Sequence, residues 1–203
     1  MMPPITCESI ASHPDFVPLA SIKDLRVDLR YATTANFMGR NMYSPLDCAW
    51  AHRDAVNGLL LAMAWLTRQR RGAHLCVLDA LRPQRVQELM WAALEGTPLS
   101  QYLAPPARGS IHSFGMAIDA TLVDAEGREF DMGTSFDDMT ELSHPTLEAA
   151  FLQAGALDNA QVSNRHLLGE AMRRGGFHGI STEWWHFDCG DRVAVRAHYA
   201  RVL

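Results

Sequence analysis

The sequence from Ser110 to Asp119 reads SIHSFGMAID and continues as ATLV to residue 123. Its latter half, residues 117–123, predicts a β-strand because apolar residues dominate it. His112 offers a neutral imidazole and Asp119 a carboxylate, and both groups are standard zinc ligands. A carboxylate on so apolar a strand needs a partner or a metal ion. Taken alone, the stretch is equally compatible with a surface histidine and an aspartate that caps a turn.

A second unusual stretch, EWWH, runs from Glu183 to His186. Two tryptophans and a phenylalanine enclose the histidine in a predicted final strand, residues 183–188. Residues three apart on a regular strand face opposite sides of the sheet. Glu183 and His186 therefore share one site only if the strand begins or bulges between them. The alternative is an amphipathic edge strand with a paired glutamate.

Together the two stretches supply three nitrogen or oxygen ligands, His112, Asp119 and His186, and one carboxylate that is left over. Catalytic zinc typically has three protein ligands and an open position, at which the metal lowers the pKa of water to about 7. We therefore predict one zinc ion per chain, with Glu183 as the general base. Arg82, at the end of an apolar strand, is the candidate cation for a developing oxyanion. The alternatives for this arginine are a structural ion pair or a carboxylate clamp.

These motifs resemble those of the zinc D-alanyl-D-alanine peptidases, and within that group those of the D-alanyl-D-alanine dipeptidases. The likeness runs from about residue 24 to 188 and includes the patterns SxHxxGxAxD and ExxH. The other matching stretches are DLRYAT at residues 28–33 with Asn36-Phe37, DALRP at 79–83 and MGTSFD at 132–137. The resemblance implies the same zinc ligands and base, and it implies that Arg82 stabilises the tetrahedral intermediate.

Three substrate contacts are implied by the resemblance alone. Tyr31 and Asp137 match positions that contact the free amino end of the substrate, and Ser110 matches a substrate-binding serine. The sequence departs from the family pattern at Leu81, where the family has an aromatic residue, and at Met116, a bulky residue in a variable position. Neither departure removes a catalytic group, but both are expected to alter the pocket.

The expected activity is hydrolysis of the free dipeptide D-Ala-D-Ala to two D-alanines. A carboxylate that pairs with the substrate ammonium discriminates against a blocked amino end, because the carboxylate is then left unpaired. One alternative is a D,D-carboxypeptidase or L,D-peptidase that acts on longer peptidoglycan peptides. An alternative from another class is a catalytically silent zinc-binding module.

The charge and hydrophobicity of the sequence limit the classes of binding partner. The 203 residues carry 18 Lys and Arg against 23 Asp and Glu, a net charge of −5, with no long basic run, which argues against nucleic acid. No apolar run approaches the ~20 residues of a membrane span, and the N-terminus lacks the features of a signal peptide. We expect a small D,D-dipeptide as partner, no nucleic acid and no membrane. The expected location is the cytoplasm, or the periplasm if a signal has been removed.

Strands and helices without regular βαβ alternation predict an α+β fold. We expect a single zinc peptidase domain, residues 1–203, in which helices pack on a mostly antiparallel sheet around a zinc cleft. We expect residues 1 to about 20 to be an N-terminal extension of this domain. The predicted strands are 25–29, 74–81, 117–123, 128–130 (after a turn at 124–127) and 183–188. The predicted helices are 53–71, 84–94 and 164–173, and an irregular loop is expected at 32–48.

Overall fold

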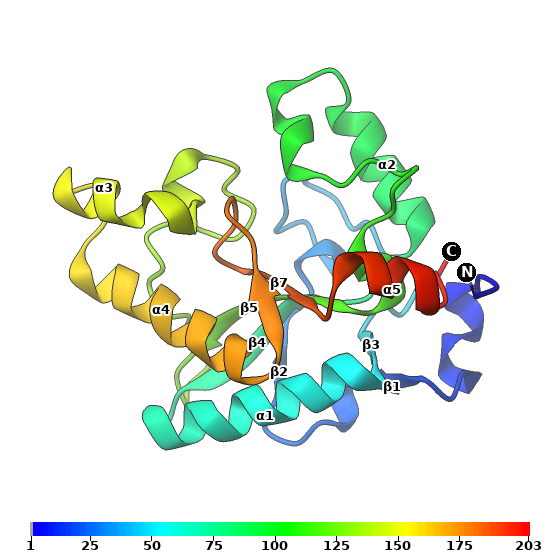
Figure 1. The fold of residues 1–203 in the computed structure, drawn as a ribbon, viewed down its shortest axis with the longest axis horizontal. Helices are drawn as coiled ribbons and strands as arrows, with labels where there is room; N and C mark the ends of the chain where they lie inside the picture. Colours follow the sequence, from blue (N-terminus) through cyan, green and yellow to red (C-terminus); the bar gives the residue numbers. More distant parts are fainter. Residues whose placement is uncertain (1) are drawn as a thin grey trace.

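The centre of the protein is a five-stranded sheet, described by a computed structural model that covers residues 2–203 (Figure 1). The strand order is β2-β4-β5-β7-β6, in which only β2 and β4 run parallel. The predicted α+β class with a mostly antiparallel sheet is therefore confirmed. The sheet strands are β2 (Arg26–Val27), β4 (His74–Asp79), β5 (Ala117–Val123), β6 (Phe177–Gly179) and β7 (His186–Cys189), and β1 (Phe16–Pro18) pairs with β3 (Trp50–His52) outside this sheet.

Two long helices pack against each other and against the sheet, as the lower left of Figure 1 shows. The side chain of His52 caps the first of them, α1, by accepting a hydrogen bond from Asp54 N at 3.2 Å. A capping box between Asp158 and Gln161 opens the second, α4. The helices are α1 (Arg53–Gln69), α2 (Gln84–Leu94), α3 (Glu148–Gln153), α4 (Asn159–Arg174) and α5 (Arg192–His198).

The bounds of several elements differ from the prediction. The helix predicted at 164–173 begins five residues earlier, at Asn159, because the capping box starts it within a polar segment that carries no apolar periodicity. The final strand begins at His186 instead of residue 183. Residues 128–130 form only an isolated bridge between Val123 and Glu129, and the strand predicted at 25–29 is reduced to 26–27. The elements β1, β3, β6, α3 and α5 are additional to the predicted ones.

The two ends of the chain lie side by side (Figure 1). Ile5 forms a parallel bridge with Val202, and Leu203 N donates a hydrogen bond to Ile5 O at 2.8 Å. Cys7 and Ile10 are buried in the main core. Residues 5–10 therefore pack onto the domain. Within residues 2–203, no helix combines the length and apolar character that crossing a membrane requires.

The contact between α1 and the end of α4 depends on two glycines. A Cβ atom on Gly58 would lie 2.5 Å from Gly175 O, and one on Gly175 would lie 2.3 Å from Gly58 O. We predict that Gly58→Ala lowers the free energy of unfolding by about 1–3 kcal/mol, because the helices must move apart. Gly169→Ala is the matched control within α4, where nothing lies within 4 Å. It should stabilise by up to about 1 kcal/mol. Urea denaturation measures both, and equal effects would contradict the predicted close approach.

Candidate metal centre and active site

The register of the three central strands brings Asp79, Asp119 and His186 into one row. Asp119 of β5 pairs with Asp79 of β4 on one side and with His186 of β7 on the other. Residues directly opposite each other on paired strands project to the same face of the sheet. The row is therefore continuous across three strands. His112 joins it from the short 3₁₀ helix Ile111–Phe114, which precedes β5.

Three side-chain atoms of this group converge. His112 Nε2 lies 3.2 Å from His186 Nδ1 and 3.3 Å from Asp119 Oδ1, and His186 Nδ1 lies 2.9 Å from the same oxygen. His112 and Asp119 are buried, and the side chain of His186 is 13% exposed. These are the residues predicted as zinc ligands, and their atoms lie close enough to bind one ion.

The other nitrogen of each imidazole is already engaged. His112 Nδ1 lies 2.8 Å from Ala80 O, a carbonyl that can only accept, so this nitrogen carries the proton. His186 Nε2 lies 3.0 Å from the carboxylate of Asp188, which likewise favours a proton on that nitrogen. In the neutral rings, His112 Nε2 and His186 Nδ1 are then unprotonated, and each directs a lone pair toward the carboxylate of Asp119. Three acceptors at such distances require a cation between them, and imidazole with carboxylate is a donor set that suits zinc.

The charged side chains of this row shift one another's pKa values. Burial raises the pKa of Asp119, but the neighbouring imidazole of His112 outweighs it and holds that pKa below its usual value. Burial also disfavours the charged form of His186, but hydrogen bonds to Asp119 and Asp188 hold its pKa well above the usual value. Asp188 itself has a pKa of about 2, because the hydrogen bond from His186 outweighs its burial. In the absence of a metal ion, a proton on His186 supplies part of the positive charge that the neighbouring carboxylates require.

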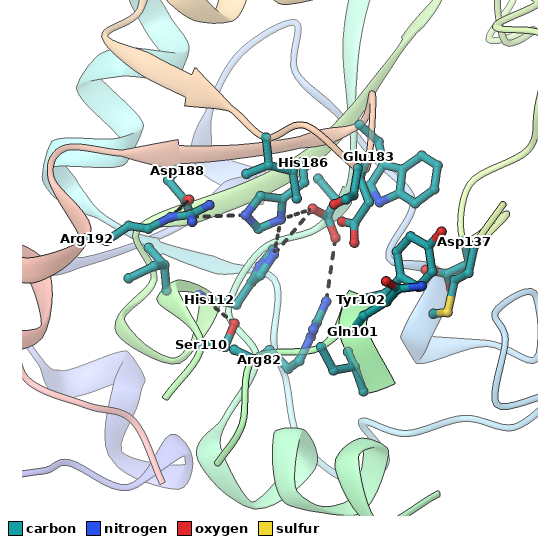
Figure 2. A pocket seen from close by; sticks show the side chains of 18 of the residues that line it. Arg82, Gln101, Tyr102, Ser110, His112, Asp137, Glu183, His186, Asp188 and Arg192 are labelled. Atoms are coloured by element: carbon teal, nitrogen blue, oxygen red, sulfur yellow. Dashed lines mark hydrogen bonds and ion pairs between the residues drawn. The ribbon is translucent and has the colours of Figure 1, made fainter. Parts of the chain in front are cut away.

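Glu183 stands beside the ligands without being one of them. The strand begins only at His186, so the loop before it directs Glu183 into the same cavity (Figure 2). Its carboxylate makes no side-chain hydrogen bond or ion pair within the described residues 2–203. Burial raises its pKa to about 7, opposed by the charge of His186. A carboxylate with this pKa can accept and return a proton near neutral pH.

Arg82 is held rigidly. Its Nε and Nη2 donate to Asp79 Oδ2 at 3.0 and 2.6 Å, and its Nη1 donates to Gln87 Oε1 at 3.2 Å. Its Nη2 also lies 3.6 Å from Asp119 Oδ2. Tyr43 donates its hydroxyl to the other oxygen of Asp79. The guanidinium therefore neutralises two buried carboxylates and still lines the cavity. Both the structural ion pair and the interaction with a reacting oxygen are compatible with this position.

The three predicted substrate contacts line the same cavity, which has a volume of about 220 Å³. Tyr31 donates its hydroxyl to Asp137 Oδ1 at 2.9 Å, and Phe37 N donates to Asp137 Oδ2 at 3.3 Å. Burial raises the pKa of Asp137 to about 7. Ser110 accepts a hydrogen bond from His112 N at 3.3 Å. The fold thus brings together all eight residues singled out in the sequence: Tyr31, Arg82, Ser110, His112, Asp119, Asp137, Glu183 and His186.

Two aspartates of this site were not singled out in the sequence. Asp79 holds Arg82, and Asp188 holds His186. A signal for each exists. Asp79 opens the matched stretch DALRP, and Asp188 follows His186 by two residues, so that both project to one face of the strand. The sequence does not show, however, that these aspartates hydrogen-bond Arg82 and His186, because those contacts depend on the fold.

Comparison with known proteins identifies the family. A family profile described as D-ala-D-ala dipeptidase, of the M15 peptidases, matches residues 12–202. This chain belongs to that family. It is 39% identical to the D-alanyl-D-alanine dipeptidase of Escherichia coli K12 over 175 residues, 86% of this chain and 84% of that protein. It is 31% identical to the D-alanyl-D-alanine dipeptidase of Enterococcus faecalis V583 over 182 residues, 80% of this chain and 85% of that protein.

A solved structure of the LdcB LD-carboxypeptidase also aligns with this chain. Its TM-score is 0.46 at 15% sequence identity, and the alignment covers 91% of this chain and 72% of that one. As a member of its family, the protein is a metallopeptidase of the dipeptidase type.

The raised pKa of Asp137 gives a prediction for the metal-free protein. In the unfolded chain this carboxyl has a pKa near 3.8, and in the folded protein near 7. Its contribution to stability is therefore fully present below the lower value and is lost as the pH rises through the higher one. Asp137→Asn removes this loss, and asparagine tolerates the φ of +63° at this position. We expect the variant to exceed wild type in free energy of unfolding by about 1–3 kcal/mol at pH 8 and by a clearly smaller margin at pH 5, which lies between the two pKa values.

Chemical denaturation at the two pH values measures this difference. Asp124→Asn is a control of opposite sign, because hydrogen bonds from Arg128 N and then from the Arg128 side chain lower the pKa of Asp124. That variant should be less stable than wild type at pH 8. An Asp137→Asn variant that loses stability at pH 8 would contradict the burial of an ionised carboxylate at this position.

Proposed function

We propose that the protein hydrolyses the free dipeptide D-Ala-D-Ala to two D-alanines and that one zinc ion per chain takes part. The observation that carries the proposal is the convergence of His112 Nε2, Asp119 Oδ1 and His186 Nδ1 within 4.8 Å of one another, beside a carboxylate that is not a ligand. The names of the relatives in E. coli and E. faecalis support the substrate. A cavity of about 220 Å³ suits a small molecule, since sites for drug-sized ligands run to roughly 300–1,000 Å³.

Zinc, when bound by these ligands, supplies a Lewis acid that acidifies water and polarises a carbonyl group. Glu183 then acts as the general base, and its carboxylate takes a proton from the attacking water. The same carboxyl group returns that proton to the nitrogen of the departing D-alanine. A pKa of about 7 suits both directions of this transfer, because neither protonation state is strongly favoured at neutral pH.

Arg82 stabilises the negative charge that develops on the carbonyl oxygen. Its hydrogen bonds to Asp79 and Gln87 fix the guanidinium before the substrate arrives, so little reorganisation is needed in the transition state. The charge of Arg82 persists in this buried position, since neighbouring carboxylates, Asp79 first, outweigh the effect of burial and raise its pKa.

Asp137 receives the ammonium group of the substrate. Tyr31 and Phe37 N hold its carboxylate in place through hydrogen bonds to its two oxygens. Ser110 accepts a hydrogen bond from His112 N, and its own hydroxyl proton is available for the substrate. An ammonium bound at Asp137 replaces the water that this half-buried carboxylate would otherwise require, so peptides without a free amino end bind poorly.

Two other functions are distinguished by experiment. A D,D-carboxypeptidase or L,D-peptidase would act on longer peptidoglycan peptides, whose amino end is blocked. A catalytically silent zinc-binding module would bind zinc stoichiometrically without turnover of any D-amino-acid peptide. The half-buried Glu183, free of other partners among residues 2–203, and the fixed Arg82 favour catalysis over silent binding.

The role of Glu183 gives a direct test. Glu183→Gln keeps the shape of the side chain and removes the base, so kcat for D-Ala-D-Ala should fall by about 100- to 10,000-fold while zinc content is unchanged. Glu126→Gln, in an exposed turn, is the control and should match wild type. D-alanine release and metal analysis of the same samples provide the readout. Equal kcat in wild type and Glu183→Gln would exclude the proposed mechanism.

The role of Asp137 gives a test of specificity. Wild type should prefer D-Ala-D-Ala over N-acetyl-D-Ala-D-Ala by more than about 100-fold in kcat/KM. Asp137→Asn should reduce this preference, chiefly by raising KM for the free dipeptide. A panel of free and N-acetylated D,D-, L,D- and L,L-peptides measures it. Blocked tripeptides hydrolysed as well as the free dipeptide would point to the carboxypeptidase alternative.

A further inference from the structure

Charged residues line the cavity on both sides of the candidate metal ligands. Asp137 and Glu183 lie to one side of the candidate metal ligands, and Arg192 lies to the other side (Figure 2). Two further arginines, Arg108 and Arg196, line the cavity as well. The acidic side has a role in the proposed function, as the site of the substrate ammonium and of the general base. Arg108, Arg192 and Arg196 have no role in it.

Arg196 has a structural role. Its Nε and Nη2 donate to Gly109 O at 3.2 and 3.1 Å, and its Nη1 donates to Arg192 O at 3.2 Å. These bonds fasten α5 to the segment that carries Ser110. The guanidinium of Arg196 therefore donates to protein carbonyl groups, and these bonds fix the backbone next to Arg108 and at Arg192.

Arg192 and Arg108 retain donors that have no protein partner. Arg192 Nε donates to Asp188 Oδ2 at 2.5 Å, which orients its guanidinium, whereas its two terminal nitrogens make no hydrogen bond within residues 2–203. The side chain of Arg108 makes no hydrogen bond or ion pair in this part of the chain. Two guanidiniums with free N–H groups can form the parallel hydrogen bonds that a carboxylate accepts.

The same end of the cavity carries excess positive charge. Asp188 is the acidic residue placed among these arginines, and its two oxygens already bind His186 Nε2 and Arg192 Nε. Burial and then the positive charges of Arg108 and Arg192 lower the pKa of Arg196, as expected where cations outnumber anions. An anionic group of the substrate would relieve this repulsion.

We propose that Arg192 and Arg108 bind the C-terminal carboxylate of the substrate. This inference rests on the proposed function, because it takes the dipeptide as the substrate. In a dipeptide, the ammonium and the carboxylate lie on opposite sides of the scissile bond, each only a few bonds away from it. Asp137 and Arg192 likewise lie on opposite sides of His112 and His186 (Figure 2). When both ends are bound in this way, the cavity selects peptides by length. Peptides with a second residue after the scissile bond are excluded.

The test compares D-Ala-D-Ala with its C-terminal amide, which keeps the amino end and the scissile bond. Wild type should prefer the free acid by about 10- to 100-fold in kcat/KM, the range expected for hydrogen bonds to a charged group. Arg192→Gln and Arg108→Gln should each lose much of this preference, through KM for the acid, so that kcat/KM falls far more for the acid than for the amide. Arg192→Lys should recover part of it.

Arg174→Gln is the matched control. Arg174 is as exposed as Arg192, at 52% against 50%, and it makes the same kind of ion pair four residues back along the chain, with Glu170 at 2.8 Å. It lies outside this cavity. The control should keep the preference of wild type for the free acid. A loss in Arg192→Gln that is equal for acid and amide would overturn the proposal, because it would show an effect through Asp188 and His186 only.

Direct binding separates this proposal from the proposed function. Calorimetry with the zinc-loaded Glu183→Gln protein should give a Kd for D-Ala-D-Ala about 10- to 100-fold below that for the amide, and Arg192→Gln added to this background should remove the difference. Such binding without hydrolysis by the wild-type enzyme would reject the dipeptidase activity and retain the carboxylate subsite. Equal or absent binding of acid and amide would overturn the subsite.

Discussion

The antiparallel register of β4, β5 and β7 is the constraint on which the site depends. It sets Asp119 between Asp79 and His186, so a single row across the sheet carries a candidate metal ligand on each of two strands and the anchor of Arg82 on the third. Because side chains alternate along a strand, a slip of one residue would turn Asp119 to the opposite face. There it would meet the apolar side of the sheet, on which α1 and α4 pack. Folding and assembly of the site are therefore one event.

Buried charge is balanced locally within this row. Arg82 lies between the carboxylates of Asp79 and Asp119, and Asp188 balances the imidazole of His186. Removing one partner from such a group leaves an uncompensated buried charge, which costs about 3–5 kcal/mol. Residues that position the site are therefore also residues that hold the fold. Asp137 and Glu183 differ, since no cation pairs with either of them among residues 2–203, and burial raises both pKa values to about 7. Their ionised forms destabilise the protein until substrate or metal is bound.

The proposed functions of the two ends of the cavity together explain how the protein would select peptides by length. Asp137 and the arginines around Arg192 are both carried by segments outside the sheet, a loop on one side and the start of α5 on the other. The sheet fixes the reacting centre, and the peripheral segments fix the distance between the groups that receive the ends of the substrate. Longer or shorter peptides would leave one charged end unpaired.

The sequence by itself determined the elements whose signals are local. Residues 84–94 and 117–123 have the predicted bounds because apolar periodicity extends over their full length. It also singled out the candidate ligands and Glu183, but only when the two stretches were considered together and with the family resemblance, since each stretch alone also admitted an interpretation without a metal ion. It predicted, too, that the strand must begin or bulge between Glu183 and His186 if they share a site, and β7 begins at His186.

Only the tertiary structure decided how these residues act together. The start of α4, the short strand β6 and the helix α5 lie in segments without clear periodicity, where capping and packing set the bounds. The proton positions on His112 and His186 depend on Ala80 O and Asp188, and the first of these partners is distant in sequence from its histidine. The arginines of the cavity, Arg82, Arg108, Arg192 and Arg196, come from three distant segments, so no single stretch of sequence indicates that they lie close together. Pairing across a sheet depends on register, and register is a property of the folded chain.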